Sequence, residues 1–171
     1  MSPKGIRYSE VNSGHSSKLY GRISLTTKGS PLFKYYHTLF YVKLSDLSLS
    51  NCTSQTDVAN LKNKYIKVIP SNIEELLTPV AIAFLIYGDG NDHKTKQIIR
   101  LCTNNLTKTE VDLLSKALLN KFNIKSRLER VRNNQFLLII RNTQVPVLQN
   151  LVKDHIHLSM LYRIGLNSIN S

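Results

Sequence analysis

Long apolar runs are absent from this chain of 171 residues. The most apolar stretch, Leu76–Tyr87, is too short to span a bilayer and ends in a charged loop. Met1–Glu10 is polar and has no apolar segment of the kind that a secretory signal needs. We therefore expect no membrane partner. The length suffices for one domain of ordinary size with a hydrophobic core.

Cysteines are scarce as well. The two present, Cys52 and Cys102, lack the spacing of a metal site and are too few for a disulfide framework, which favours a reducing compartment. The segment His155-Ile-His157 suggests a metal-binding pair at first sight. Neighbouring histidines of this kind are more often surface or packing residues, and the sequence offers no evident third ligand.

Acidic residues are few, and basic residues are many. Lys and Arg number 23 against 11 Asp and Glu, which gives a formal net charge of +12. Such an excess points to a polyanion, because cationic side chains displace counterions from phosphate backbones. A ribosomal-type or merely soluble basic protein has the same charge. The abundance of Asn, Ile, Lys, Leu and Ser is typical of an A+T-rich genome, and organellar genomes are common examples.

The first part of the chain gives few periodic signals. The first eighteen residues, with glycines and several serines, predict a loop or frayed terminus. Tyr20–Thr27 alternates as a strand, and Ser30-Pro31 starts a helix whose apolar face is formed by Leu32, Tyr35, Tyr36 and Leu39. Residues 43–64 are polar and predict an inserted loop with a helical turn near Val58–Leu61. Tyr65–Pro70 predicts a short extended segment.

A helix that begins at Thr78-Pro79 is apolar on every side. A surface helix has one apolar stripe, so we expect this helix to be buried on all faces. Ala81, Leu85 and Gly88 follow one side at helical spacing. The small residues there would let another backbone approach closely. Gly88-Asp89-Gly90 ends the helix.

The rest of the chain shows clearer signals. Gln97–Thr103 predicts a strand, and Thr107 with Glu110 forms a capping box ahead of an apolar stripe at Val111, Leu114, Leu118 and Phe122. Ser126–Arg132 and Gln135–Arg141 predict a hairpin around Asn133-Asn134. Val145–Lys153 predicts a last helix.

Two segments repeat the same order of elements. Residues 23–33 and 138–148 both run from strand through polar turn and proline to amphipathic helix. Coincidence can explain this at such low identity, but a degenerate duplication accounts better for the shared order. We therefore predict a partial first repeat over residues 1–70, with the insertion at about 43–64, and a complete second repeat over 71–171.

Leu77–Gly90 resembles the signature helix of LAGLIDADG homing endonucleases, with the nine signature positions at Ile82–Gly90. Leu77-Thr-Pro79, Leu101–Asn104 and Met160–Arg163 are typical of the mitochondrial group-I-intron branch. The resemblance covers about Tyr20–Leu166. It implies an α+β fold, with an antiparallel sheet and helices on one face. It also implies a homing-type DNA endonuclease that hydrolyses phosphodiesters at a long recognition site in double-stranded DNA.

The resemblance also implies an active site. Asp89 matches the acidic position that holds a divalent cation, here Mg²⁺, with the backbone of Gly88 beside it. Asp is also common in a Gly-Asp-Gly turn without any ligand. Lys67 matches a family lysine near the reacting phosphate, and Arg163 falls where the other half has its lysine. Both are equally compatible with ordinary phosphate-facing cations.

Recognition in this family uses antiparallel strands in the DNA major groove. The polar side chains that we expect on such strands are Arg100, Thr103, Arg127, Arg130, Arg132 and Arg141. Any one of them can instead contact phosphate or solvent. The packing of two signature helices is implied for Ala81, Leu85 and Gly88.

Departures from the family pattern also matter. Gly88 stands where this branch often has an acidic residue, and no first signature helix is found before Tyr20. The sequence therefore predicts a shortened endonuclease. Its second acidic helix would come from another copy, as a homodimer, or from a separately encoded N-terminal half. The alternative is a catalytically inactive protein that binds intron RNA as a maturase or stabilises it. Location in mitochondria or another organelle follows from the resemblance.

Overall fold

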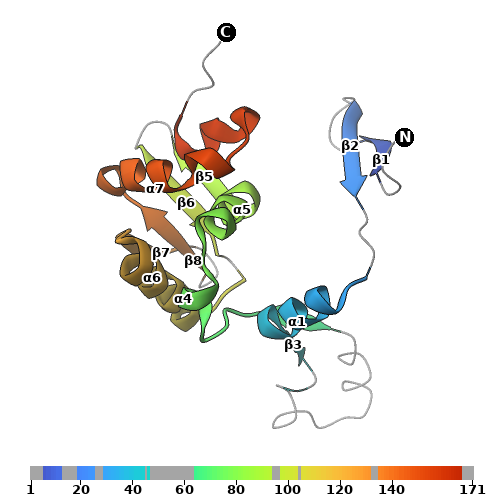
Figure 1. Cartoon of the computed structure of the whole chain (residues 1–171), viewed down its shortest axis with the longest axis horizontal. Helices are drawn as coiled ribbons and strands as arrows, with labels where there is room; N and C mark the ends of the chain where they lie inside the picture. The colour runs from blue at the N-terminus through green and yellow to red at the C-terminus, as the bar shows by residue number, and fades with distance from the viewer. Residues whose placement is uncertain are drawn as a thin grey trace. The chain divides into compact units, whose positions relative to one another are not determined.

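The computed structural model describes residues 6–12, 19–25, 29–44, 46, 64–93, 97–103, 105–131 and 135–166, without the side chains of 6–12, 19–25 and 91–93. Two compact units divide between His37 and Thr38. The elements in chain order are β1 (Ile6–Asn12), β2 (Leu19–Leu25), α1 (Pro31–Phe40), β3 (Tyr41–Lys43), β4 (Tyr65–Lys67), α4 (Ile73–Leu76), α5 (Pro79–Asp89), β5 (Gly90–His93), β6 (Ile98–Cys102), α6 (Lys108–Phe122), β7 (Ser126–Arg130), β8 (Phe136–Ile140), η2 (Asn142–Gln144), α7 (Val145–Val152), η3 (Lys153–His155) and η4 (Leu158–Ile164) (Figure 1).

Strands β1 and β2 pair as an antiparallel hairpin in the N-terminal unit. The register runs from Ile6 opposite Leu25 to Asn12 opposite Leu19. The strand predicted at Tyr20–Thr27 is confirmed as β2. The loop predicted for the first eighteen residues was wrong over β1. A ladder of backbone hydrogen bonds can form without strong apolar alternation, and this explains why the sequence pattern missed it.

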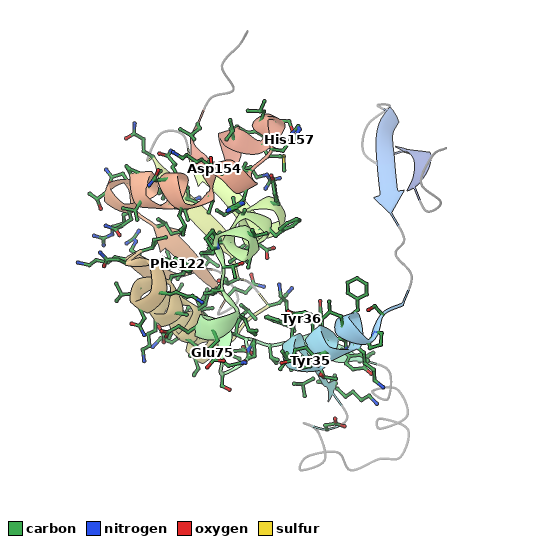
Figure 2. All side chains as sticks on the ribbon, in the orientation of Figure 1. Tyr35, Tyr36, Glu75, Phe122, Asp154 and His157 are labelled. Atoms are coloured by element: carbon green, nitrogen blue, oxygen red, sulfur yellow. The ribbon has the colours of Figure 1, made fainter. Side chains whose placement is uncertain are left out.

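Helix α1 begins where Ser30-Pro31 predicts. The Ser30 hydroxyl accepts a hydrogen bond from the Leu32 amide at 3.3 Å. No residue of α1 is buried. Leu32 and Phe33 are exposed, at 58% and 52%, whereas Leu39 and Phe40 at its end are half-buried. Tyr35 and Tyr36 contact each other edge to face, with ring centroids 5.4 Å apart. Figure 2 labels both side chains on this helix.

Strands β3 and β4 form a two-stranded antiparallel ribbon in the second unit, with Tyr41 opposite Lys67. This confirms the extended segment predicted after residue 64. Most of the predicted insertion at 43–64, including the helical turn near Val58–Leu61, lies outside the described residues. The predicted division into repeats over 1–70 and 71–171 stays a prediction.

A four-stranded antiparallel sheet with the order β5-β6-β8-β7 forms the centre of the second unit. The predicted strand at Gln97–Thr103 and the predicted hairpin are confirmed, with ends one or two residues shorter. Strand β5 was not predicted. Its residues Gly90–His93 are polar, and they are extended because they pair with β6, with Gly90 opposite Leu101. The α+β class is confirmed.

Alternate residues of the sheet face the helices and form the core with them. Ile99, Leu101, Leu138 and Ile140 are at most 1% exposed. The capping box of α6 is complete, and the stripe that it precedes is buried at Val111, Leu114 and Leu118. Helix α7 adds Leu148 and Val152. Among the described residues, no helix has the length and apolar character needed to cross a membrane.

Candidate active site

Helix α5 is fixed at both ends by local contacts. The Thr78 hydroxyl caps its start by accepting from the Ala81 amide at 3.1 Å, and Pro79 occupies the first turn. At its end, the Gly90 amide donates to the Ile86 carbonyl. A Cβ at Gly90 would lie 2.5 Å from that oxygen, so only glycine fits without movement. Asp89 is therefore the last residue of a firmly anchored helix.

The two sides of α5 differ in burial. Ile82, Ala83 and Ile86 are at most 1% exposed, whereas Val80 is 44% and Phe84 67% exposed. The expectation that α5 is buried on all faces was therefore wrong for this chain by itself. The physical reason is that the sheet and its neighbouring elements cover one side, and no described residue covers the other.

The residues predicted for helix packing border this open side. Ala81 and Leu85 are half-buried, and Gly88 is exposed. A Cβ added at Gly88 would meet nothing within 4 Å, so no contact with a described residue explains a glycine there. The helix-packing role of these residues stays a prediction.

Lys67 and Asp89 lie together although they come from different elements. The Lys67 Nζ atom is 3.8 Å from Asp89 Oδ2, and the two side chains are 44% and 38% exposed. An ion pair this open to solvent contributes little to folding stability. Its consequence is electrostatic, because it places a mobile positive charge beside the carboxylate.

Arg163 contacts the other side of the same helix end. Its Nη1 atom donates to the Gly90 carbonyl at 2.6 Å, and its guanidinium lies 5.7 Å from the centre of the Tyr162 ring. A cation suits the negative end of a helix dipole. The Arg163 Nε atom is buried and has no hydrogen-bond partner in the described part of the chain. This donor is closed to solvent in the described part of the chain, so the Arg163 contact that the structure shows is the one with the Gly90 carbonyl.

Tyr87 joins the last turn of α5 to the segment between η3 and η4. Its hydroxyl donates to the His155 carbonyl at 3.3 Å and accepts from the His157 amide. Both histidines are exposed. Among the residues that the structure describes, no group of three or more His, Cys, Asp or Glu side chains could hold a metal ion. The backbone of His155–His157 is thus part of the support for α5.

Two pockets meet at Asp89. One, of about 350 Å³, is lined by Gly88, Asp89, Gly90, Cys102, Tyr162 and Arg163. The other, of about 170 Å³, is lined by Lys67, Asp89, Cys102, Thr103 and six mostly apolar residues. The structure therefore brings together the three residues predicted for catalysis, with Lys67 in one pocket, Arg163 in the other and Asp89 in both.

A single carboxylate fits one half of a magnesium site. Mg²⁺ takes one or two carboxylates, retains several waters and accepts phosphate oxygens as ligands. Asp89 is accessible, and Gly88 lies in the last helical turn, whose carbonyls lack partners within the helix. The donors present suit a hard cation that shares its remaining ligands with substrate and a second carboxylate.

The sheet face away from the helices carries two of the predicted arginines. Arg100 and Arg127 are both opposite Ile139 in the register, one on each neighbouring strand. Ile139 is fully buried on this face, and the aliphatic stems of the flanking arginines are suited to cover it. The Arg100 Nε atom is buried without a hydrogen-bond partner among the described residues, whereas Arg127 pairs with Glu129 at 2.9 Å.

The other predicted nucleic-acid contacts lie elsewhere. Thr103 is 4% exposed, and its hydroxyl donates to the Phe136 carbonyl at 2.7 Å. This side chain is therefore not placed to contact bases. Arg130 is on the opposite face of β7 from Arg127 because side chains alternate along a strand. Arg141 is exposed and follows β8 rather than lying in it. Arg132 lies outside the described residues.

Sequence reasoning missed Cys102 and Tyr162. Cys102 lines both pockets because Leu101 pairs with Gly90, which puts the next residue of β6 beside Asp89. The strand prediction contained Cys102, but the unpredicted β5 supplies the partner that brings it to the site. Tyr162 lies within the quoted Met160–Arg163 segment, and only the structure shows it lining a pocket with Arg163.

This arrangement of sheet and helices has a match among solved structures. The homing endonuclease I-WcaI bound to its DNA recognition sequence superimposes with a TM-score of 0.69 at 20% identity, covering 98% of this chain and 66% of that one. The chain therefore has the fold of a LAGLIDADG homing endonuclease.

Sequence comparison gives the family directly. The model of the LAGLIDADG DNA endonuclease family matches residues 3–148, so the chain belongs to that family. The match begins earlier than Tyr20, where the resemblance was expected to start, and includes β1.

Named relatives fall into two groups. The cytochrome b mRNA maturase bI2 of Saccharomyces cerevisiae is 34% identical over 66% of this chain and 27% of its own length. The maturase bI2 of Debaryomyces hansenii is 36% identical over 61% of this chain and 40% of its own. The intron-encoded endonuclease ai4 of Dictyostelium discoideum is 27% identical over 87% of this chain and 80% of its own. The chain thus spans less than half the length of the two maturases.

Proposed function

We propose that this chain supplies one half of the active site of a homing-type DNA endonuclease. The observation that carries the proposal is the position of Asp89, at the anchored end of α5, between Lys67 and Arg163 and beside an exposed apolar helix face. A second acidic helix completes the site. It comes from another copy of the chain or from a separately encoded half.

Each residue has a distinct task in this proposal. The Asp89 carboxylate and the Gly88 carbonyl would hold Mg²⁺. When bound, Mg²⁺ supplies Lewis-acid stabilisation of the phosphate oxygens and lowers the pKa of a bound water. The Lys67 ammonium stabilises charge that develops on the reacting phosphate. Arg163 holds the Gly90 carbonyl with Nη1 and places the positive charge of its guanidinium beside the pocket that Asp89 lines.

Double-stranded DNA is the proposed substrate, bound on the face of the sheet away from the helices. Arg100 and Arg127 flank Ile139 there, one on each strand that neighbours β8, and each can bond guanine edges or phosphates. The formal charge of +12 favours the same polyanionic partner. The bound DNA of the I-WcaI structure supports the choice.

A cleavage assay tests the proposal. The full chain is incubated with Mg²⁺ and DNA carrying the intronless insertion site, and Asp89→Asn is compared with Asp112→Asn. Asp112 is on α6, is paired with Lys108, and lines neither of the two pockets at Asp89. We expect cutting by the wild type and Asp112→Asn, and none by Asp89→Asn or after chelation of Mg²⁺. Absence of cutting at concentrations that saturate DNA would reject a stand-alone nuclease.

A maturase role is the second candidate, favoured by the two cytochrome b mRNA maturases at 34% and 36% identity. In this role the basic surface holds intron RNA without cleaving it. Asp89→Asn would then leave RNA affinity unchanged. Affinity should fall steeply with salt, because phosphate contacts release counterions. The names of these relatives and the composition typical of A+T-rich genomes also support a mitochondrial or other organellar location.

A further inference from the structure

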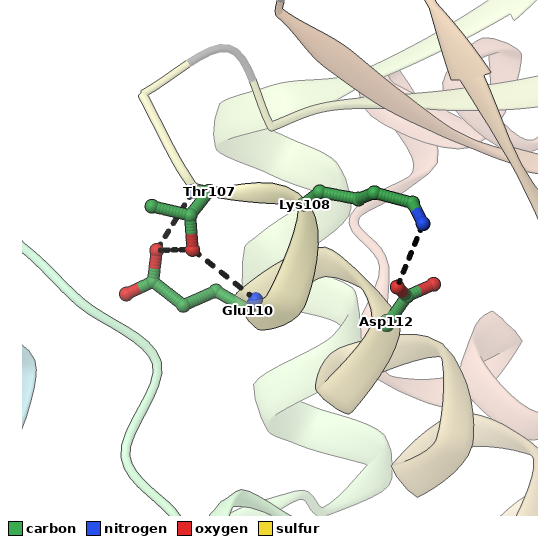
Figure 3. Close-up of polar contacts among 4 residues, drawn as sticks. All are labelled: Thr107, Lys108, Glu110 and Asp112. Carbon is green, nitrogen blue, oxygen red and sulfur yellow. Dashed lines mark hydrogen bonds and ion pairs between the residues drawn. The ribbon is translucent and has the colours of Figure 1, made fainter.

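The carboxylate of Glu110 binds two separate parts of the chain. Its Oε2 atom accepts from the Thr107 amide and the Thr107 hydroxyl, both at 2.7 Å. These are the contacts of the capping box at the start of α6, which Figure 3 shows in close-up. Its Oε1 atom accepts from the Ile69 amide at 3.1 Å. One side chain thus joins the start of α6 to the segment that follows β4.

Strand β4, which carries Lys67, is held at its end by the Val68 amide, which donates to the Phe40 carbonyl at 2.8 Å. All three of its residues are exposed, and its strand partner is β3, also three residues long. A two-stranded ribbon is at best marginally stable. The exposed pair of Lys67 with Asp89 at 3.8 Å is too weak to hold the strand. The Glu110 contact lies two residues from Lys67 and is a charge-assisted hydrogen bond, which is stronger than a neutral one.

Further along, the same segment is attached to the other end of α6. The Lys121 ammonium donates to the carbonyls of Glu74 and Glu75 at 2.9 and 3.1 Å, and the Asn120 amide donates to the Glu74 carboxylate. Helix α6 therefore contacts the residues after β4 at two places, the Ile69 amide in the connection and helix α4 itself. Of these, the contact with Glu110 is the one nearest to Lys67 in the chain.

We propose that Glu110 is a positioning residue: by holding the Ile69 amide, it keeps the Lys67 ammonium beside Asp89. The importance of that pairing for cleavage rests on the proposed function. The positioning itself does not, because it concerns the order of residues 65–69 in the folded chain.

The matched variants are Glu110→Ala and Thr107→Ala in the full chain. Thr107→Ala removes the hydroxyl of the cap but leaves the carboxylate and the amides of residues 107 and 69. It therefore weakens the helix start without removing the attachment of Ile69. Glu110→Gln keeps an acceptor oxygen and serves as the rescue. Glu110→Asp, one methylene shorter, replaces Glu110→Ala if the latter does not fold.

Hydrogen exchange and NMR give the first result. We expect Ile69 amide exchange to accelerate about tenfold or more in Glu110→Ala, to stay near wild type in Thr107→Ala, and to be partly restored in Glu110→Gln. The Lys67 side-chain signals should shift on Asp89→Asn in the wild type. In the Glu110→Ala background the same substitution should leave them unmoved. Unchanged Ile69 protection, or a persistent Lys67 response, would overturn the proposal.

Cleavage gives the second result. Glu110→Ala should lower kcat, and the combination with Lys67→Ala should be no worse than Lys67→Ala alone, since both remove the same charge from the site. Fully additive losses would show that Glu110 acts by another route. Absence of cutting by the wild type would reject a stand-alone nuclease, while the exchange and NMR results would still decide the positioning role.

Discussion

Helices α5 and α6 pack beside the same sheet with opposite sequence patterns. Helix α6 has one apolar stripe, which is buried, and a charged outer face with Lys108 paired to Asp112. Helix α5 is apolar throughout and leaves Val80 and Phe84 exposed. The difference teaches that the apolar stripe of α6 is covered within its own chain, although Leu119 beside it is 40% exposed. The exposed apolar side chains of α5 are not needed to bury the core of this chain. They support our proposal that a second helix packs on that face.

The largest expected effect contrasts one apolar residue from each helix. Leu118→Ala removes a fully buried side chain of α6 and should lower the free energy of unfolding by about 2–5 kcal/mol. Phe84→Ala changes a side chain of α5 that is 67% exposed and should stay within about 0.5 kcal/mol. Urea unfolding at low protein concentration measures both. Similar losses would mean that the open face of α5 is covered in the free chain.

The two glycines at the end of α5 give the next contrast. Gly90→Ala places a Cβ 2.5 Å from the Ile86 carbonyl and should cost about 1–3 kcal/mol of stability. Gly88→Ala meets no atom within 4 Å and should leave the stability of the free chain unchanged or raise it by up to about 1 kcal/mol, as expected from helix propensity. Thermal unfolding measures both changes. If Gly88→Ala alone loses self-association or DNA cutting while it keeps its stability, Gly88 serves the packing of a second helix rather than the folding of this chain.

The smallest effects concern the start of α6. Thr107→Ala removes a cap whose hydroxyl accepts from the Glu110 amide at 3.3 Å and should cost about 0.5–2 kcal/mol. Lys108→Ala breaks an exposed pair at 3.9 Å and should cost no more than about 0.5 kcal/mol. Figure 3 shows the contacts between Thr107 and Glu110 and the ion pair between Lys108 and Asp112. Chemical unfolding of the two variants in parallel checks the order, and the reverse order would contradict the assignment of the cap.

Local signals predicted most of the second unit. The cap and proline at Thr78-Pro79 and the capping box at Thr107 place two helices without any knowledge of tertiary contacts. Strand β5 was not predicted from the sequence, because Gly90–His93 has no apolar alternation and is extended only through its pairing with β6. The exposure of Phe84 was not predicted either, because a sequence shows that a residue is apolar but not whether another residue covers it.

The site was predicted residue by residue rather than as an arrangement. Asp89, Lys67 and Arg163 were each singled out, but their distances depend on contacts between distant segments. The bond from the Ile69 amide to Glu110 is such a contact, and the helix cap alone already accounts for a Glu at that position. Conversely, Thr103 fits a surface strand by pattern, and only the structure shows its hydroxyl bound inside.

The most direct test of the central claim is a mixing experiment. Wild-type chain and Asp89→Asn are combined in equal amounts at constant total concentration, and Mg²⁺-dependent DNA cutting is measured. If α5 pairs with a second copy, about one quarter of the dimers carry two Asp89 residues, and activity falls to that level. If the second half is separately encoded, each assembly holds one copy of this chain. About one half of the assemblies then carry Asp89, and about one half of the activity remains. Undiminished cutting, or cutting by Asp89→Asn alone, would contradict the claim that Asp89 is one half of the active site.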